Sequence, residues 1–204
     1  MSRAEIIGMI SGALVIISVI PYGIRTYQKV VQPNLTSWFL WTIIGFALLV
    51  TYKSSGAGAN IWPAVFGFIN PLIITLLVLY RRGGWQRPER LEIVCLILGF
   101  LSLGMWGMVY DDKERAQFAL YLAIMADMCA AIPTIKFIWM NPSEDRPFAW
   151  SFYAVGYGLG IFAITEHTFA NYILPVYMFG GALAISLPLA WHRLKQRAPL
   201  MEWV

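Results

Sequence analysis

The chain has 204 residues, of which 59% are hydrophobic and 13% are charged, and its mean hydropathy is +0.63. This composition excludes an ordinary soluble globular domain, in which about 25% of residues are charged. The net charge of +4 does not indicate nucleic-acid binding, because the basic residues lie singly or in small groups between apolar runs. We therefore expect a lipid bilayer, and not nucleic acid, as the partner of this protein.

Seven apolar runs approach the roughly 20 residues that a helix needs to cross about 30 Å of hydrocarbon. In chain order they occupy residues 5–27, 37–53, 60–80, 91–110, 116–138, 148–165 and 170–191. Backbone polar groups inside a bilayer must be satisfied within the segment, and these runs lack the alternation of barrel strands. The predicted fold class is therefore an all-α membrane protein with seven transmembrane helices, of which the second and sixth are short.

The distribution of basic residues predicts how the helices are oriented. If the N-terminus lies outside, 11 of the 15 Lys and Arg residues fall on the inner side. The positive-inside rule therefore favours an external N-terminus and a cytoplasmic C-terminus. We expect an integral protein of the bacterial inner membrane.

A motif near the N-terminus occurs twice. The stretch PYGIRTYQKVVQPNLTSWFLW, residues 21–41, returns 112 residues later as PTIKFIWMNPSEDRPFAWSFY. The shift pairs Pro21 with Pro133 and Trp38 with Trp150. Each copy contains a proline near the end of an apolar run, a basic turn, and an aromatic residue opening the next run. Such duplication predicts one site formed between two halves.

The same shift divides the chain into units. Residues 1–82 form a first three-helix repeat, 83–114 a loop and linker helix, 115–194 a second three-helix repeat, and 195–204 a cytoplasmic tail. Three crossings leave the chain on the opposite side of the membrane from where it began. One linker helix returns it to the starting side, so both repeats have the same orientation. The predicted arrangement is thus two parallel three-helix bundles joined by a linker (3+1+3), a plan that places a substrate near the membrane midplane.

The motifs PYGIRTYQKVVQPNLTSW and PTIKFIWMNPSEDRPFAW, together with this helix plan, resemble the SWEET, SemiSWEET and PQ-loop transporter superfamily. The resemblance covers almost the whole chain in architecture. It implies alternating-access movement of a small polar solute that is sugar-like, vitamin- or nucleoside-like, or amino-acid-like. It also implies that Pro21 and Pro133 act as hinges. PnuC-type transporters and the KDEL receptor share the helix plan as more distant relatives.

The chain departs from that family pattern in three respects. Tyr22 and Thr134 replace the glutamine that names the PQ-loop. The proline that SWEETs carry inside the second helix of each triple is absent. The family's sugar site uses an asparagine from the third helix of each triple, but only Asn70 is present and Ala182 occupies the equivalent position. The sequence therefore does not specify a sugar as the substrate.

Asp127 is the only carboxylate deep within any apolar run. An ionised Asp at the centre of a membrane helix costs about 2.5–3.5 kcal/mol, so it is expected to face the bundle interior. It is a candidate proton-coupling group or an acceptor for a polar or cationic substrate. The structural alternative is a protonated Asp that bonds a backbone carbonyl or a Tyr and holds two helices together.

Asn70 and Pro71 lie within the third run. The amide of Asn70 suits a hydroxyl-rich or amide ligand, because it can donate and accept hydrogen bonds. Pro71 removes one helical hydrogen bond, so we expect a bend or break there and a third hinge position. The alternative is that Asn70 only satisfies the carbonyl of Gly67 that the proline leaves free.

Aromatic residues recur at the starts of the second and sixth runs. Trp38 and Trp150 are expected in the interfacial aromatic belt. Trp41 and Tyr153, three residues further in, are expected to line an inner vestibule or gate. The predicted substrate-binding residues are therefore Asn70, Asp127, Trp41, Tyr153, Tyr157 and Tyr177.

Arg25 lies at the inner end of the first run, where it marks topology or forms a gate with Glu144 or Asp145. The glycines at positions 45, 156, 158 and 160 are expected to allow close helix packing. His167 and His192 are isolated, so we expect no metal site and no cofactor. No nucleophile and base lie at catalytic spacing, which argues against an enzyme.

The sequence therefore predicts a transporter for a small polar solute, with proton coupling left open. The alternative is a seven-helix receptor or binding protein on the same scaffold that moves nothing across the membrane. Either protein could be a monomer or a homo-oligomer.

Overall fold

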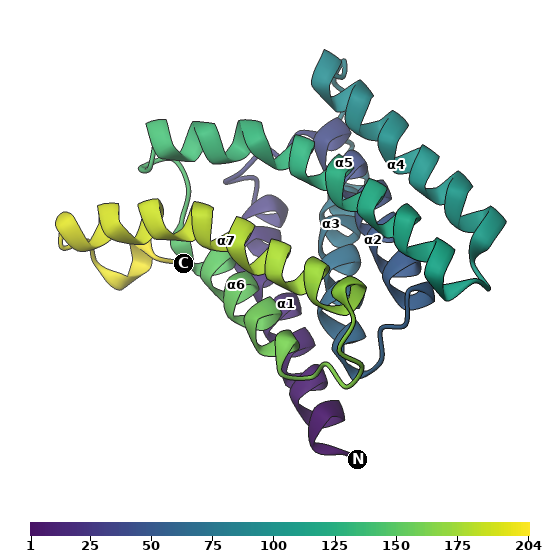
Figure 1. Cartoon of the computed structure of the whole chain (residues 1–204). Coiled ribbons are helices and arrows are strands. Elements are labelled where there is room, and N and C mark those ends of the chain that lie inside the picture. The colour runs from purple at the N-terminus through teal and green to yellow at the C-terminus, as the bar shows by residue number, and fades with distance from the viewer.

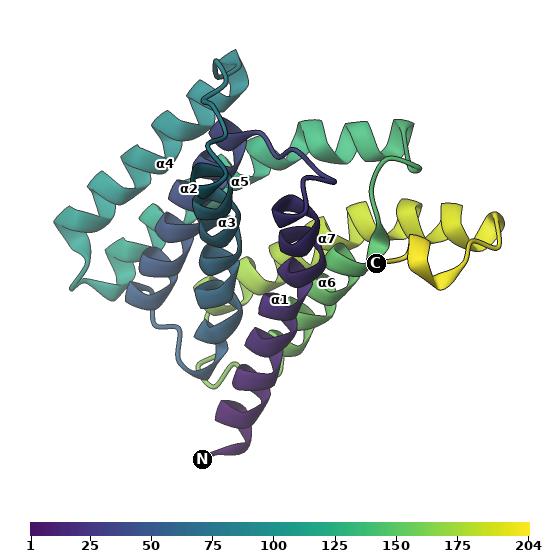
Figure 2. The same cartoon turned by 180° about the vertical axis from the view of Figure 1, so that it is seen from behind.

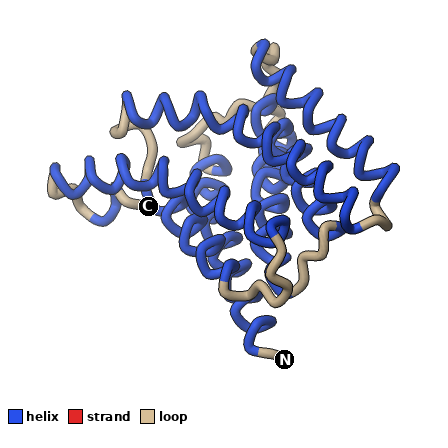
Figure 3. Tube along the Cα trace, viewed as in Figure 1, coloured by secondary structure: helices blue, strands red, loops and turns tan.

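The computed structural model describes all 204 residues, which form seven α-helices and two short 3₁₀ helices without any strand (Figure 3). The α-helices are α1 Arg3–Tyr27, α2 Leu35–Ser54, α3 Trp62–Tyr80, α4 Arg90–Val109, α5 Lys113–Met140, α6 Pro147–Ile161 and α7 Phe169–Lys195. The 3₁₀ helices are η1 Ala59–Ile61 and η2 Leu200–Glu202. The all-α class and the seven helices agree with the sequence prediction.

Polar residues in the loops determine where several helices begin. The side chains of Ser2, Asn34, Asp112 and Thr168 accept hydrogen bonds from backbone N–H groups in the first turns of α1, α2, α5 and α7. These groups would otherwise have no partner at a helix start. Helix α6 begins with Pro147, whose missing N–H costs nothing at the first helical position.

Six of the seven helices are long and apolar enough to span a membrane, and α6 is the exception. Helix α6 has 15 residues, about 22 Å of helix at 1.5 Å per residue. The predicted sixth span, 148–165, therefore extends too far, because the chain turns after Ile161 and leaves the helix. The molecule is an integral membrane protein with six candidate spans.

Helix α4 shows most directly that the molecule faces lipid. Its exposed surface carries large apolar side chains, including Ile97, Phe100 and Leu101, each more than half exposed. Only Cys95, Gly99 and Ser102 are buried in this helix. Such an apolar surface suits a hydrocarbon environment and not water.

The helices pack in a consistent order. Helix α3 contacts both α1 and α2, and α7 contacts both α5 and α6. The most extensive contact between these two groups is α1 against α6, while α2 packs against α5. Helix α4 packs on α2 and α5, at the edge of the molecule (Figures 1 and 2). In both views α5 and α7 run beside each other, across the direction of α1 and α3.

Glycine allows α1 and α6 to approach closely. A Cβ added at Gly156 would lie 2.6 Å from Val15 Cγ2 and 2.9 Å from the Ser11 carbonyl oxygen. A Cβ at Gly160 would lie 3.0 Å from Pro63 Cγ on α3. The close-packing role predicted for these glycines agrees with the structure.

The three prolines predicted as hinges lie inside continuous helices. Pro21 is in α1, Pro71 in α3 and Pro133 in α5, and none of these helices is interrupted. The break expected at Pro71 is therefore absent. One proline removes a single ladder hydrogen bond, and the neighbouring turns of α3 keep theirs.

Replacing Gly156 by Ala is expected to destabilise the protein, because the new methyl group overlaps Val15 and the Ser11 carbonyl. Overpacking of this kind costs about 1–3 kcal/mol. The matched control is Gly104→Ala in α4, where an added Cβ meets no atom within 4 Å. Thermal unfolding in detergent should show a fall of several degrees for Gly156→Ala and none for Gly104→Ala. Equal melting temperatures would contradict the packing described for α1 and α6.

Candidate functional site

A cavity of about 360 Å³ lies between the helices, at the lower end of the range of about 300–1,000 Å³ that small-molecule sites occupy. Six helices contribute to its wall, and α4 contributes no residue. The wall combines three tryptophans and four tyrosines with a few polar side chains. Such a wall is typical of a site for an organic ligand and not for a hydrated ion.

Positions related by the 112-residue shift meet across this cavity. Seven such pairs line it: Val19 and Ala131, Tyr22 and Thr134, Ser37 and Ala149, Trp38 and Trp150, Trp41 and Tyr153, Gly45 and Tyr157, and Asn70 and Ala182. More than half of the 25 lining residues belong to these pairs. The cavity wall is thus built from equivalent positions in the two copies of the repeat.

The structure brings all six predicted substrate-binding residues to the same cavity, which is lined by Asn70, Asp127, Trp41, Tyr153, Tyr157 and Tyr177. Their role in binding stays a prediction. Of the three hinge candidates, Pro71 lines the cavity, whereas Pro21 and Pro133 do not.

Asp127 on α5 is 4% exposed and lines the cavity. Its Oδ2 accepts a hydrogen bond of 2.7 Å from the hydroxyl of Tyr177 on α7. This contact joins two helices, as the structural alternative predicted, and it leaves Oδ1 without a hydrogen bond from the protein. No Lys, Arg or His pairs with Asp127. The carboxyl group therefore keeps one acceptor oxygen for another molecule or a proton.

Asn70 on α3 is oriented by helix α1. Its Nδ2 donates to the Val15 carbonyl oxygen at 2.8 Å and to Ser18 Oγ at 3.2 Å. Both amide protons are thus used, and neither reaches the carbonyl of Gly67. The Oδ1 atom is buried and has no hydrogen-bond partner. An unpartnered buried oxygen is costly, so this acceptor favours a ligand that donates a hydrogen bond.

The aromatic residues stand in two groups along the wall. Tyr22 and Trp38 have ring centroids 5.1 Å apart, and those of Tyr153 and Tyr157 are 4.9 Å apart. Both tyrosine hydroxyls of the second group point at α3, where a Cβ on Gly67 would lie 2.3 Å from the Tyr157 oxygen. Gly67 is thus the residue that leaves room for these rings.

Trp38 and Trp150, which the sequence predicted in the aromatic belt at the membrane surface, also line the cavity. The indole of Trp150 donates to Asp145 Oδ2 at 2.9 Å. Both residues are amphipathic, and position near a helix start alone could not distinguish a lipid-facing ring from one facing the interior. Their recurrence at equivalent places in the repeat is the signal that favours the interior.

Sequence reasoning missed Asp145 and Tyr22 as lining residues. Asp145 lies in the polar loop between α5 and α6, where a carboxylate is expected to be solvated. Tyr22 stands at the position of the glutamine in the PQ-loop motif that the sequence resembles, and its repeat partner Thr134 also lines the cavity. The repeat register could have identified Tyr22, but no sequence signal distinguishes Asp145.

The loop that lines the cavity lies at one end of the helices. Ser37 in the first turn of α2 and Asp145 in the α5–α6 loop mark the mouth of the cavity. No residue of the loops at the opposite end lines it. There the helices are in close contact, and the Tyr52 hydroxyl donates to the Asn171 carbonyl at 2.7 Å, joining α2 to α7.

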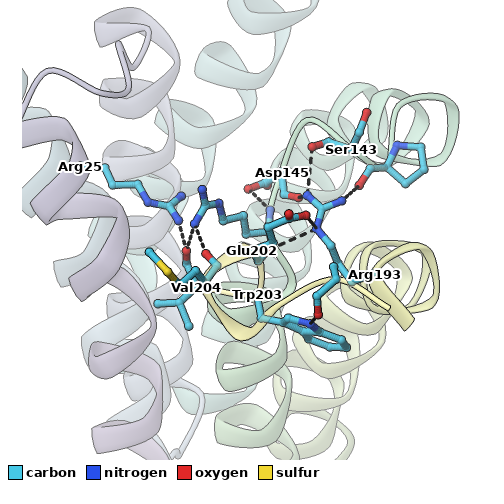
Figure 4. Close-up of polar contacts among 11 residues, drawn as sticks. Arg25, Ser143, Asp145, Arg193, Glu202, Trp203 and Val204 are labelled. Carbon is cyan, nitrogen blue, oxygen red and sulfur yellow. Dashed lines mark hydrogen bonds and ion pairs between the residues drawn. The ribbon is translucent and has the colours of Figure 1, made fainter. Parts of the chain in front are cut away.

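A buried arginine holds the loop that carries Asp145. Arg193 on α7 donates to the carbonyl oxygens of Ser143 at 3.0 Å and Asp145 at 3.1 Å, and more weakly to Pro142 at 3.4 Å. Its Nε also donates to the Glu202 carbonyl at 3.2 Å (Figure 4). One side chain thus fixes both the mouth loop and the C-terminal segment.

The C-terminal segment 199–204 lies beside the mouth of the cavity. The guanidinium groups of Arg25 on α1 and Arg146 before α6 both donate to the Val204 carbonyl oxygen (Figure 4). The backbone N–H of Phe148 donates to the Trp203 carbonyl at 3.0 Å. Arg25 therefore forms no ion pair with Glu144 or Asp145, which corrects the gate pairing considered from the sequence.

Comparisons with family models, with curated proteins and with solved structures find no match for this chain. The similarity to the SWEET superfamily therefore rests on the motif and the helix plan alone.

Cysteine labelling is expected to distinguish the cavity face of α5 from its lipid face. In a background with Cys95 and Cys129 replaced by Ala, Thr134→Cys should react with a water-soluble thiol reagent. The matched control is Ile132→Cys, two residues away on the same helix, which is exposed at 56% but does not line the cavity. It should react slowly in liposomes, because thiolates do not form in lipid. Faster reaction at position 132 would contradict the described cavity.

Arg193→Lys is expected to loosen the mouth loop, because a lysine cannot donate to four carbonyl groups with a rigid planar fork. Losing buried hydrogen bonds worth about 1–3 kcal/mol should accelerate amide exchange in residues 141–146 roughly tenfold or more. Hydrogen–deuterium exchange in detergent measures this change. Arg197→Lys, at an exposed position, serves as the control and should leave the exchange unaltered. Unchanged exchange in both variants would show that Arg193 does not hold the loop.

Proposed function

We propose that the chain is a membrane transporter that moves a small polar solute by alternating access between two three-helix units. The units are residues 1–82 and 115–194, with residues 83–114 as loop and linker helix and 195–204 as a cytoplasmic tail. The cavity between them is the solute site. The observation that carries this proposal is the set of seven repeat-related pairs in its wall.

The packing order supports two equivalent units. In each, the last helix lies against the first two, since α3 contacts α1 and α2 while α7 contacts α5 and α6. The second helices begin at Leu35 and Pro147, which are 112 residues apart, as the repeat requires. Helix α4 contributes nothing to the cavity, which suits a linker. A site between two repeats is the common plan of secondary transporters.

The two ends of the cavity would exchange roles during transport. With the N-terminus outside, the mouth beside Ser37 and Asp145 faces the cytoplasm. The opposite end is closed by Gly160 against Pro63 and by the Tyr52 contact to Asn171, all of which join the two units. Rocking of the units, with Pro21 and Pro133 as hinges, would open this end and close the mouth.

Asp127 would carry the proton or the charge of the solute. It is the buried carboxylate of the cavity, and Tyr177 on the neighbouring helix of the same unit orients it. Asn70 on the other unit would accept a hydrogen bond from the solute. The two residues that the repeat does not duplicate thus lie on opposite units and define an asymmetric site.

Purified protein in liposomes is expected to take up members of a labelled panel of amines, sugars, nucleosides, vitamins and amino acids. Ala182→Phe should reduce this uptake at least tenfold, because the ring fills the cavity beside Asn70. The matched control, Val176→Phe, changes a lipid-facing position of the same helix and should transport normally.

The alternative receptor function gives a different result in the same assay. Saturable binding that Ala182→Phe abolishes, without accumulation of any solute inside the liposomes, would favour a receptor and contradict transport. Uptake that Ala182→Phe leaves unchanged would contradict the cavity as the path.

A further inference from the structure

We propose that the solute is a small organic cation that carries a hydroxyl or N–H donor and no carboxylate. This inference rests on the proposed role of the cavity as the solute site and names the class of ligand. It follows from three properties of the wall: its charge, its free hydrogen-bonding atoms and its aromatic rings.

The charged side chains of the cavity wall are all negative. Two carboxylates, Asp127 and Asp145, line the cavity, and no Lys, Arg or His does so, although the chain has 15 basic and 11 acidic residues. A solute with a carboxylate or phosphate would find no cationic side chain within the cavity, and its burial would be unfavourable. The wall therefore selects against anions and zwitterions and favours a positive charge.

Two acceptor oxygens of the cavity residues have no hydrogen bond from the protein. Asp127 Oδ1 has no hydrogen bond from the protein, and Asn70 Oδ1 is buried without a partner. Both amide protons of Asn70 are used on helix α1, and Ser18 Oγ donates to the Val15 carbonyl at 2.6 Å. A ligand that supplies a donor, such as a hydroxyl or N–H group, would satisfy these oxygens.

Aromatic faces supply the remaining contact. Seven rings from four helices surround the cavity, and their negative faces attract cations within about 6 Å of the ring centre. Aromatic residues at helical spacing usually form a packed core, but these rings border an open volume of about 360 Å³. An aromatic wall combined with one buried carboxylate is the chemistry that binds alkylammonium and quaternary ammonium groups.

Asp145 at the mouth contributes less to binding than Asp127. Its Oδ1 accepts from the Arg146 backbone N–H at 2.7 Å, and its Oδ2 accepts from the Trp150 indole. Both oxygens are thus engaged, and the carboxylate attracts a cation to the mouth without offering a free acceptor. The deep position near Asp127 and Asn70 is the place where charge and donor are both recognised.

Three probes of nearly equal shape test this inference. Choline carries a quaternary ammonium and a hydroxyl. The alcohol 3,3-dimethylbutan-1-ol, here called dimethylbutanol, has the same shape with carbon in place of the charged nitrogen. Glycine betaine keeps the quaternary ammonium but carries a carboxylate. Equilibrium dialysis with the purified protein in detergent should show choline binding at least about tenfold more tightly than either analogue. The reason is that gaining or losing a charge pair removed from water changes the dissociation constant by more than a factor of about ten.

Variants of the wall locate the binding. Asp127→Asn and Trp41→Leu should each weaken choline binding about tenfold or more, while Trp41→Phe retains a ring and loses less. Trp191→Leu removes a lipid-facing tryptophan, 72% exposed, and should bind choline as the unmodified protein does. Thermal unfolding of each variant shows whether it is folded. If Asp127→Asn does not fold, the comparison of Trp41→Leu with Trp41→Phe tests the inference.

The possible failures are distinguishable. If dimethylbutanol or betaine binds as tightly as choline, or choline does not bind at millimolar concentration, the cation inference is wrong even if liposomes accumulate neutral solutes. If choline binds selectively but neither choline nor any other solute crosses the membrane, the inference stands and the transport proposal fails.

Discussion

The structure depends on one constraint: in hydrocarbon every polar group must find a partner within the protein or in an enclosed cavity. The backbone satisfies it by forming helices, and most polar side chains satisfy it on the nearest carbonyl. Ser18 and Thr51 donate back to their own helices in this way. Asp127 Oδ1 and Asn70 Oδ1 have no hydrogen bond from the protein, and both residues line the same cavity. Asn171 Oδ1 is also buried without a partner, but Asn171 does not line the cavity. Two acceptor oxygens without a protein donor thus belong to residues of the cavity wall.

Close packing narrows the space between the helices at the end away from Asp145. There Gly160 on α6 lies close to Ser11 on α1 and Pro63 on α3. At the other end the wall is built from bulky rings and from a loop that Arg193 fixes through its carbonyl groups. These hydrogen bonds give the loop a defined position. The same arginine binds the C-terminal segment, which couples that segment to the mouth.

Some features follow from the sequence because they depend on composition along a single helix. The helices, and the inward orientation of Asp127 and Asn70, were predictable because a polar side chain in a long apolar run is unfavourable when it faces lipid. The repeat also predicted which positions meet, because equivalent residues such as Trp41 and Tyr153 line the cavity together. The end of α6 was not predictable, since residues 162–164 remain apolar after the helix has ended.

Other features depend on contacts between distant segments and leave no local signal. Arg193 resembles any basic residue at the end of a span, yet its partners are main-chain carbonyls of a loop about 50 residues away. Asp145 lies in a polar turn and lines the cavity only because that turn folds over its mouth. For Trp38 and Trp150 the sequence predicted the aromatic belt, and their place in the cavity wall depends on tertiary packing.

The central claim, that the cavity opens alternately to the two sides of the membrane, can be tested by cysteine labelling. Thr134→Cys in sealed vesicles of known orientation would be exposed to a membrane-impermeant thiol reagent from one side and then from the other. The account predicts labelling from both sides, with a solute that binds the cavity slowing both reactions. Labelling from one side only, at every solute concentration and temperature tested, would contradict alternating access and leave a one-sided binding protein.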